Sequence, residues 1–455
     1  MTSDLAISRA TSDRGISGIG GNSGLLRICT AGSVDDGKST LIGRLLYDSR
    51  SVYEDQVQSI EKASKNRNAG PIDFSLFTDG LRAEREQGIT IDVAYRYFAT
   101  ARRKFILADT PGHEQYTRNM ATGASTADVA ILLVDARNGV RTQSKRHARI
   151  ARLLGITDFV LAVNKMDLMD FDRDVFDKIL EDFGDLLSGA AVHAIPMSAL
   201  HGDNVITTSD RTPYFDGPPL LEYLETVHVH RNTSAAPFRL PVQLVLRPDD
   251  VFRGYAGQIV SGSVKPGDRV TTWPSGRSAN VERIVTFDGD VSLAFAPMSV
   301  TLTLDDEIDI SRGDVLTLQP ALVGQTFEAE VVWMDERPLD PGRVYLLKHG
   351  ARTVTAEINH PLMLNQIGTV QVSTSRPLVF DRYADNRGTG NFILIDPGTH
   401  FTSGAGMITQ PLHAAVPAHG APRSFAQRVA HMARHAASDE EAADLVRKAI
   451  EEMLA

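Results

Sequence analysis

The sequence has few of the features that mark secreted or membrane proteins. It contains one cysteine, Cys29, in 455 residues, which excludes an internal disulfide and indicates a reducing, cytoplasmic setting. Cys29 lies in an apolar run and is expected to be a small core residue rather than a nucleophile. No apolar run approaches a membrane span, because the longest candidate, residues 129–134, has the length of a buried strand.

Positive charge is also in deficit. The chain has 47 Lys and Arg against 57 Asp and Glu, a net charge of -10, which gives no general electrostatic reason to expect a nucleic acid as partner. A local basic patch stays open. Residues 1–24 lack the apolar stretch of a signal peptide and are rich in Ser, Gly and Asp, so we expect a disordered tail.

What the sequence does contain is a long alternation of strand and helix patterns. The chain length suggests about two to four domains. Apolar runs with β-branched residues alternate with helical stretches from 25 to about 235, which predicts an α/β domain with a mostly parallel sheet and helices on both faces. In such a sheet, ligand groups collect in the loops after the carboxyl ends of the strands.

The first of these loops has the spacing of a phosphate-binding loop (P-loop) between a strand and a helix. Glycines at both ends let the backbone N–H groups surround a polyphosphate at the start of the helix. We expect Lys38 to reach the β- and γ-phosphates and the Ser39 hydroxyl to bind Mg²⁺. The predicted nucleotide contacts in this loop are Gly32, Ser33, Val34, Asp35, Asp36, Gly37, Lys38, Ser39 and Thr40.

Two further segments carry groups suited to a γ-phosphate. The hydroxyl of Thr90 can close on Mg²⁺ only while the γ-phosphate is present, which predicts a switch. Asp109 ends a strand run and can hold Mg²⁺ through water, and Gly112 lets a backbone N–H approach the γ-phosphate. His113 is placed to orient the attacking water. The charge run at 82–86 is interpreted as a solvated helix face.

Two later loops carry groups that recognise a guanine base. The carboxylate of Asp167 can accept hydrogen bonds from N1–H and the 2-amino group of guanine, neither of which adenine presents. The stem of Lys165 can lie over the base, and Asn164 can tie this loop to the phosphate loop. The last loop follows another strand run and contains Ser198, Ala199 and Leu200. We expect the Ala199 N–H to reach guanine O6, so the predicted ligands are GTP or GDP with Mg²⁺.

The order of these motifs resembles that of GTPases of the translation-factor class. Residues 34–46, 83–98 and 113–125 closely resemble the large, GTP-hydrolysing subunit of bacterial sulfate adenylyltransferase. Elongation factors usually carry His-Gly-Lys-Thr where this chain has Asp-Gly-Lys-Ser at 36–39. The resemblance continues through 202–205, 252–257 and 386–396 and covers roughly residues 25–410.

The resemblance implies a partner and a reaction. In that family a small catalytic subunit lets sulfate attack the α-phosphate of ATP, giving adenosine 5′-phosphosulfate and pyrophosphate, and the large subunit couples GTP hydrolysis to this uphill step. Two alternatives stay open: a translation elongation factor that delivers aminoacyl-tRNA, and a regulatory GTPase without a metabolic partner. Some relatives continue into a kinase for the product's 3′-hydroxyl, which we do not expect here because a second P-loop pattern is missing.

The helical period disappears beyond about residue 236. Alternating apolar positions, as in 240–246, and turns such as 265–268 predict two small antiparallel β-barrels, over 236–326 and 327–412. Trp273 and Trp333 are expected in a barrel core or rim rather than in a ligand site. Residues 413–455 are predicted to form a linker and a helical tail, whose apolar face over 424–455 is a candidate docking surface for a partner.

Overall fold

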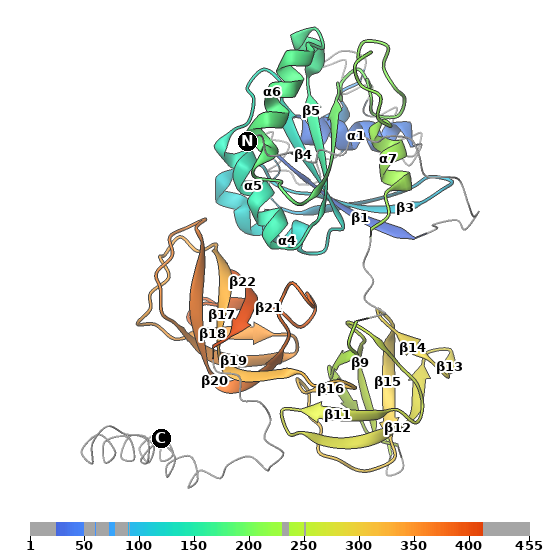
Figure 1. Cartoon of the computed structure of the whole chain (residues 1–455), viewed down its shortest axis with the longest axis vertical. Helices are drawn as coiled ribbons and strands as arrows, with labels where there is room; N and C mark the ends of the chain where they lie inside the picture. Colours follow the sequence, from blue (N-terminus) through green and yellow to red (C-terminus); the bar gives the residue numbers. More distant parts are fainter. Residues whose placement is uncertain are drawn as a thin grey trace, which may run out of the picture.

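The computed structural model describes residues 24–49, 60, 72–77, 90, 92–229, 236–249 and 252–412 (Figure 1). Nearly all of the predicted N-terminal tail, the charge run at 82–86 and the predicted helical tail lie outside the described residues. Within these ranges an α/β domain is followed by two antiparallel β structures. Among the helices of these ranges, none combines the length and the apolar character that a membrane span requires.

The sheet of the α/β domain consists of β1 (Leu25–Ala31), β2 (Ala94–Ala99), β3 (Lys104–Asp109), β4 (Val129–Asp135), β5 (Asp158–Asn164) and β6 (Ala191–Pro196). The strand order is β2-β3-β1-β4-β5-β6, and neighbours are parallel except for the antiparallel pair β2 and β3. β4 is buried at every position, as a central strand with both faces covered must be. The predicted mostly parallel sheet is confirmed.

The helices of this domain are α1 (Lys38–Asp48), α4 (Thr117–Ser125), α5 (Thr142–Leu153), α6 (Arg173–Gly184) and α7 (Leu220–Thr226), with 3-10 turns η1 (Phe74–Phe77), η2 (Glu114–Tyr116) and η3 (Met166–Met169). α1 and α7 pack on one face of the sheet, and α4, α5 and α6 pack on the other (Figure 1). α1 faces the sheet with Leu41, Ile42 and Leu45, whose spacing forms one helical stripe.

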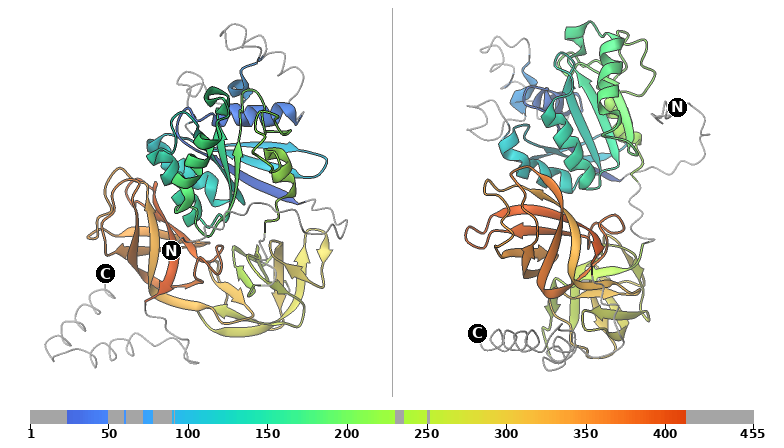
Figure 2. Two further views of the ribbon diagram at one scale, coloured as in Figure 1. Left: turned by 45° about the horizontal axis from the view of Figure 1, so that its top comes forward. Right: turned by 60° about the vertical axis from the view of Figure 1, so that its left-hand side comes forward.

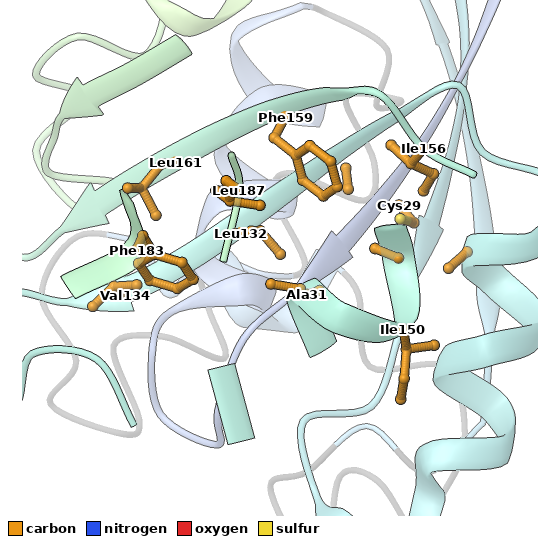
Figure 3. Packing of buried hydrophobic residues seen from close by; sticks show 14 of the residues in the cluster. Cys29, Ala31, Leu132, Val134, Ile150, Ile156, Phe159, Leu161, Phe183 and Leu187 are labelled. Atoms are coloured by element: carbon orange, nitrogen blue, oxygen red, sulfur yellow. The ribbon is translucent and has the colours of Figure 1, made fainter. Parts of the chain in front are cut away.

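Cys29 lies on β1 inside the apolar cluster between the sheet and helices α4 to α6 (Figure 3). Its side chain is fully buried beside residues such as Ile150 and Phe159. Burial raises the pKa of the Cys29 thiol to about 12, so the nucleophilic thiolate is not formed at neutral pH. The prediction that Cys29 is a core residue is confirmed.

The first antiparallel sheet contains β7 (Arg239–Pro241), β8 (Leu244–Leu246), β9 (Gly254–Gln258), β11 (Arg269–Trp273), β12 (Arg277–Thr286), β13 (Gly289–Asp290), β15 (Ser299–Leu304) and β16 (Val315–Thr317). Its order is β7-β16-β11-β12-β15-β9-β8, with β13 paired to β12. A separate short pair joins β10 (Ser263–Val264) to β14 (Ala294–Phe295).

The run at 240–246, predicted to be antiparallel β structure, forms two short strands in this sheet. β7 and β8 lie at opposite ends of the strand order although only residues 242 and 243 separate them in the chain. The Val242 N–H donates to Asp314 O on the β16 side, at 2.8 Å, and the Gln243 N–H donates to Ala256 O on β9, at 2.9 Å. One stretch of chain therefore joins both edges, so the sheet rolls round on itself as a barrel with a break in its ladder.

The second antiparallel sheet is a closed barrel of β17 (Leu322–Trp333), β18 (Tyr345–His349), β19 (Arg352–Ile358), β20 (Ile367–Phe380), β21 (Asn391–Ile395) and β22 (Thr402–Pro411). Trp333 is buried in its core with Phe327 and Phe392. Trp273 of the first sheet is also buried, and its indole N–H donates to Thr317 Oγ1 at 3.0 Å. Both tryptophans are core residues, as predicted.

The closed barrel lies next to the α/β domain (Figure 2) and contacts it at η2 and α4. Arg118 Nη2 donates to Met334 O at 3.1 Å, and Asn365 Nδ2 donates to Glu114 O at 3.3 Å. Met334 also belongs to the apolar cluster that α4 and α5 cover. The segment that follows Gly112 in the chain is therefore attached directly to the barrel.

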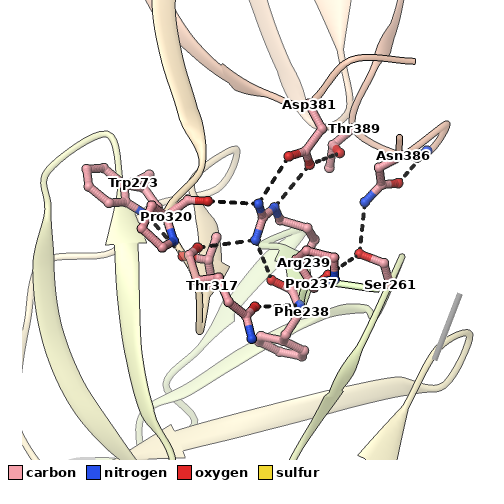
Figure 4. Close-up of polar contacts among 12 residues, drawn as sticks. Pro237, Phe238, Arg239, Ser261, Trp273, Thr317, Pro320, Asp381, Asn386 and Thr389 are labelled. Atoms are coloured by element: carbon pink, nitrogen blue, oxygen red, sulfur yellow. Dashed lines mark hydrogen bonds and ion pairs between the residues drawn. The ribbon is translucent and has the colours of Figure 1, made fainter. Parts of the chain in front are cut away.

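Arg239 joins the two antiparallel sheets (Figure 4). Its guanidinium is nearly buried and makes a two-point ion pair with Asp381, Nε to Oδ2 at 3.0 Å and Nη2 to Oδ1 at 3.1 Å. The remaining N–H groups donate to backbone carbonyls, among them Pro320 O at 3.0 Å. Thr389 Oγ1 donates to Asp381 Oδ2 at 2.6 Å, so both members of the pair are well satisfied. The two sheets are expected to move as one body.

Replacing Arg239 by alanine should destabilise this junction, because Asp381 would keep its charge in a largely buried place without its partner. The expected cost is about 3–5 kcal/mol. Thermal unfolding is the measurement, and the midpoint temperature of the first transition should fall by several degrees. Arg283→Ala, which breaks the exposed Arg283–Asp290 pair, is the matched control and should change little. Equal midpoints for the two variants would contradict the assigned role of Arg239.

Candidate nucleotide-binding site

The phosphate loop lies where β1 ends and α1 begins. Gly37 is the N-cap of α1 with φ 94°, a left-handed conformation, and a Cβ at this position would overlap the Asn164 side chain. At Gly32 a Cβ would lie 2.7 Å from Leu133 O on β4. The two glycines therefore allow the loop to bend tightly against its neighbours, as the sequence spacing predicts.

Lys38 is the cation at the centre of this loop. Its side chain is buried, and Nζ donates to Gly32 O at 3.1 Å and to Ser33 O at 2.8 Å. Burial lowers the pKa of Lys38, while the nearby carboxylates of Asp109, Asp36 and Asp35 act in the opposite direction. A buried cation enclosed by a loop of backbone N–H groups is suited to hold a polyphosphate.

Asn164 ties the phosphate loop to the two predicted base loops. Its Nδ2 donates to Asp36 O at 2.8 Å, which is the connection predicted from the sequence. Its Oδ1 accepts from the Ala199 N–H at 2.9 Å. The Ala199 N–H that we predicted for guanine O6 is therefore engaged with Asn164 here, and must share or exchange this bond to reach a base. Within the loop, the Ser33 N–H donates to Asp36 Oδ2 at 2.6 Å.

Lys165 extends from the end of β5 toward the phosphate loop. Its ammonium donates to Asp35 O at 2.5 Å and pairs with Asp135 Oδ2 at 3.0 Å. Burial alone raises the pKa of Asp135, but hydrogen bonds from Arg137 and Lys165 outweigh it and bring the value to about 2. Asp135, which the sequence reasoning did not identify, therefore stays ionised and pairs with the Lys165 ammonium.

Asp109 and Gly112 approach the phosphate loop from β3. Asp109 is buried, and Thr30 Oγ1 donates to its Oδ1 at 3.5 Å. A Cβ on Gly112 would overlap Lys38 Nζ and lie 2.8 Å from Gly32 O, so only glycine allows this approach. The structure thus brings the Gly112 backbone beside the Lys38 ammonium, where the γ-phosphate contact is predicted.

His113 follows Gly112 directly and is half-buried. Its Nδ1 accepts from the Gln115 N–H at 3.3 Å and caps η2, and its ring lies 5.8 Å from that of Tyr116. These contacts leave Nε2 as the ring atom for a water. The other member of the predicted switch, Thr90, is half-buried, and its neighbours at 79–89 lie outside the described residues. The roles of His113 and Thr90 stay predictions.

The remaining predicted base residues lie on two turns. Asp167 is on η3, where His201 Nε2 lies 3.6 Å from its Oδ2. Residues 198–203 form a tight turn in which the Gly202 N–H donates to Ser198 O at 2.7 Å. The Leu200 carbonyl accepts from Arg44 of α1 at 3.1 Å. The turn at 198–203 is therefore held by a contact with the helix that follows the phosphate loop.

His147 on α5 holds the beginning of the phosphate loop and was missed from the sequence. It is fully buried, and its Nδ1 accepts from the Gly32 N–H at 3.2 Å. Burial, assisted by the charges of Lys38 and Arg146, lowers the pKa of His147 to about 3, so the ring is neutral and keeps the lone pair that Gly32 uses. Ser144, from the same helix, lies with its hydroxyl 3.2 Å from that of Ser33.

The donors near Lys38 fit a magnesium ion that a nucleotide carries. In the ranges that the structure describes, no three His, Cys, Asp or Glu side chains are grouped to hold a metal by themselves. Mg²⁺ typically takes one or two protein oxygens and completes its shell with phosphates and water. The Ser39 hydroxyl, in the first turn of α1, and the buried Asp109 carboxylate are oxygen donors of this kind.

A separate cleft of about 710 Å³ lies between α5 and the closed barrel, lined by residues that include Arg149, Gly155 and Arg382. None of the predicted nucleotide residues lines it. The predicted nucleotide residues instead lie in loops around Lys38 at the carboxyl ends of β1, β3, β5 and β6, which is where ligands bind in sheets of this kind.

A doubly covered parallel sheet with a phosphate loop and two base loops defines a GTPase of the elongation-factor type. A family model described as "Elongation factor Tu GTP binding domain" matches residues 23–230, and one described as "GTP-eEF1A C-terminal domain-like" matches residues 359–409. Among solved structures, sup35 complexed with GMPPNP aligns with 24% identity over 86% of this chain and 94% of that chain, with a TM-score of 0.37.

Relatives with known names show which family of GTPases this chain belongs to. "Sulfate adenylyltransferase subunit 1" of Bacteroides thetaiotaomicron is 52% identical over 84% of this chain and 86% of its own length. The protein of the same name from Bacteroides fragilis is 53% identical, with the same coverage. "Bifunctional enzyme NodQ" of a Rhizobium species is 51% identical over 86% of this chain and 65% of its own length. This chain belongs to the sulfate adenylyltransferase subunit 1 family, as the sequence resemblance predicted.

The neutral state of His147 makes a pH prediction. Because the folded pKa lies near 3 and the unfolded value near 6.5, the unfolded chain binds more protons between these limits. The stabilising effect is fully present above about pH 6.5 and declines as the pH falls. From pH 7.5 to 5.5 the loss attributable to His147 should be about 1.4 kcal/mol.

His147→Asn keeps an acceptor for the Gly32 N–H but has no proton to bind. Between pH 7.5 and pH 5.5 the midpoint temperature of the first thermal transition should therefore decrease more in the wild type than in the variant. The expected difference between the two decreases is about 3 °C or more. Identical pH dependence of the two proteins would show that His147 is not held neutral in the folded chain.

Proposed function

We propose that this chain is the GTP-hydrolysing subunit of a sulfate adenylyltransferase and couples hydrolysis to the formation of adenosine 5′-phosphosulfate. The observation that carries the proposal is the Asn164 bridge, which joins the phosphate loop to a base loop in a chain of this family. The family name "subunit 1" supports a partner subunit. We identify that partner as the small catalytic subunit, where ATP and sulfate react, and place the complex in the cytoplasm.

The binding step uses groups of the phosphate loop and of the two base loops. The Lys38 ammonium and the backbone N–H groups of residues 34–40 hold the phosphates, since the N–H groups of Gly32 and Ser33 already donate to His147 and Asp36. Asp167 accepts from guanine N1–H and the 2-amino group. The stem of Lys165, whose ammonium is held by Asp135, covers the base. Ser39, Thr90 and Asp109 are the proposed holders of Mg²⁺, which when bound neutralises charge on the β- and γ-phosphates.

The hydrolytic step needs a positioned water. Nδ1 of His113 is engaged by the Gln115 N–H, so Nε2 is the atom that can orient a water toward the γ-phosphate. Gly112 brings its backbone N–H to the same phosphate. When the γ-phosphate leaves, Gly112 and Thr90 lose their ligand. The segment that follows Gly112 is then released from the phosphate.

Coupling follows from what this segment contacts. Glu114 and Arg118, just beyond Gly112, bond to Asn365 and Met334 of the closed barrel. A change at the γ-phosphate can therefore alter the position of the barrels against the α/β domain. The equilibrium of the partner's reaction shifts only as far as its intermediates bind the two states with different affinity.

The alternative of a factor that delivers aminoacyl-tRNA has weaker support. Relatives with 51–53% identity carry the subunit 1 name, and the net charge of -10 is unfavourable for binding RNA. A filter-binding test with charged tRNA separates the two proposals, because nucleotide-dependent retention is expected only of the elongation factor.

Lys38→Ala should abolish GTP hydrolysis, because the phosphates lose their buried cation. Steady-state phosphate release is the measurement, and the rate should fall to the level of a sample without protein. Lys178→Ala, which removes an exposed lysine of α6, is the control and should retain full activity. Circular dichroism verifies that both variants are folded. Normal turnover by folded Lys38→Ala protein would refute the assignment of the loop.

His113→Ala tests the water-orienting role. The turnover number for GTP should fall by about 10²–10⁴, while the Kd for GDP stays unchanged, because the proposed role appears only in the hydrolytic step. His228→Ala, at an exposed histidine of the same domain, is the control. A rise in the Kd for GDP with little change in turnover would assign His113 to binding instead.

A further inference from the structure

Arg44 connects the helix of the phosphate loop with a loop that we assign to the guanine base. It lies on α1, and its Nη1 donates to the carbonyl of Leu200 at 3.1 Å. Leu200 is the residue after Ala199 in the chain. Its Nε pairs with Asp48 Oδ2, one turn along the helix, at 2.7 Å. The ion pair with Asp48 thus orients the Arg44 guanidinium, which contacts the base loop at Leu200.

The turn at 198–203 is shaped to receive this guanidinium. Gly202 has φ 89°, and a Cβ there would overlap Arg44 Nη2 and lie 2.8 Å from Cζ. The turn is closed by the Gly202 N–H donating to Ser198 O at 2.7 Å. Glycine therefore serves two needs here: the left-handed backbone, and space for the Arg44 side chain against the turn.

The same loop is held from its other side by Asn164, which accepts from the Ala199 N–H. Ala199 therefore lies between two anchors, Asn164 at its own N–H and Arg44 at the next carbonyl. Both anchors also contact the phosphate-loop region, Asn164 at Asp36 O and Arg44 through α1 itself. The distance between phosphate and base contacts is then set by two buried or half-buried side chains rather than by the turn alone.

Arg44 also contacts the segment that leads to the predicted switch. Its Cζ lies 5.0 Å from the centre of the Phe74 ring of η1, within the range of a cation–π interaction. Gly43 permits the close approach of η1 to α1, because a Cβ on residue 43 would overlap Phe74 O. Tyr47 packs edge-on against the same ring, with centroids 5.7 Å apart.

We infer that Arg44 is a positioning residue that holds the base loop in register with the phosphate loop, and so contributes to guanine-nucleotide affinity without touching the nucleotide. This inference rests on the proposed function of the loops. Arginine suits the task because one planar fork serves Asp48, Leu200 and the Phe74 ring together. Lysine has a single point charge and can replace only one of these contacts well.

The experiment compares Arg44→Ala and Arg44→Lys with the wild type in two binding assays. GDP reports on phosphate and base contacts together, and inorganic tripolyphosphate, used as a competitor, reports on the phosphate loop alone. For Arg44→Ala we expect the Kd for GDP to rise about tenfold, the size of one lost charge-assisted hydrogen bond, with tripolyphosphate affinity unchanged. Arg44→Lys should fall between Arg44→Ala and the wild type.

The matched control is Arg173→Ala, which removes an exposed arginine that also pairs four residues along its helix, with Asp177. It should leave both affinities unchanged. Unchanged GDP affinity in Arg44→Ala, or an equal loss for GDP and tripolyphosphate with a lower thermal midpoint, would overturn the positioning role. Failure of the wild type to bind GDP would instead overturn the proposed function, so the two failures are distinguishable.

Discussion

The amide of Asn164 is the contact on which the site depends. Its donor reaches Asp36 O of the phosphate loop and its acceptor holds the Ala199 N–H, so one buried side chain joins loops that follow β1, β5 and β6. Both of its polar ends are satisfied, which a buried amide requires. The parallel register of the sheet brings these loops to one edge, and Gly37 gives the amide its space. The loops proposed to bind the phosphates and the base are therefore connected through one side chain.

The same arrangement gives the proposed hydrolysis a route to the rest of the molecule. Gly112 lies against Lys38, and the residues that follow it, Glu114 and Arg118, are bonded to the closed barrel. The barrel is in turn joined to the first antiparallel sheet through Arg239. A rearrangement that begins at the γ-phosphate is thus transmitted to the two barrels, which are joined through Arg239. We expect a partner subunit to respond to the displacement of this two-barrel unit.

Most of the fold, and the loops in which the proposed site residues lie, could be predicted from the sequence, because buried strands read as apolar runs and the motifs follow them directly. Asn164 was placed correctly since its motif has a short, well-defined spacing. His147 and Arg44 were missed because they act through distant partners, which no local pattern reveals. The run at 240–246 was predicted as antiparallel β structure, but alternation shows only which face is buried, not that the two halves pair with different neighbours. The engagement of the Ala199 N–H likewise depends on a tertiary contact.

The central claim is that this chain uses a guanine nucleotide to drive chemistry in a companion subunit. The most direct measurement is the amount of adenosine 5′-phosphosulfate formed at equilibrium from ATP and sulfate by the complex with the small subunit, compared with hydrolysable GTP, with a non-hydrolysable GTP analogue and without guanine nucleotide. The account predicts that the yield rises above the value without nucleotide only when GTP can be hydrolysed. An equal yield in the three samples would contradict it.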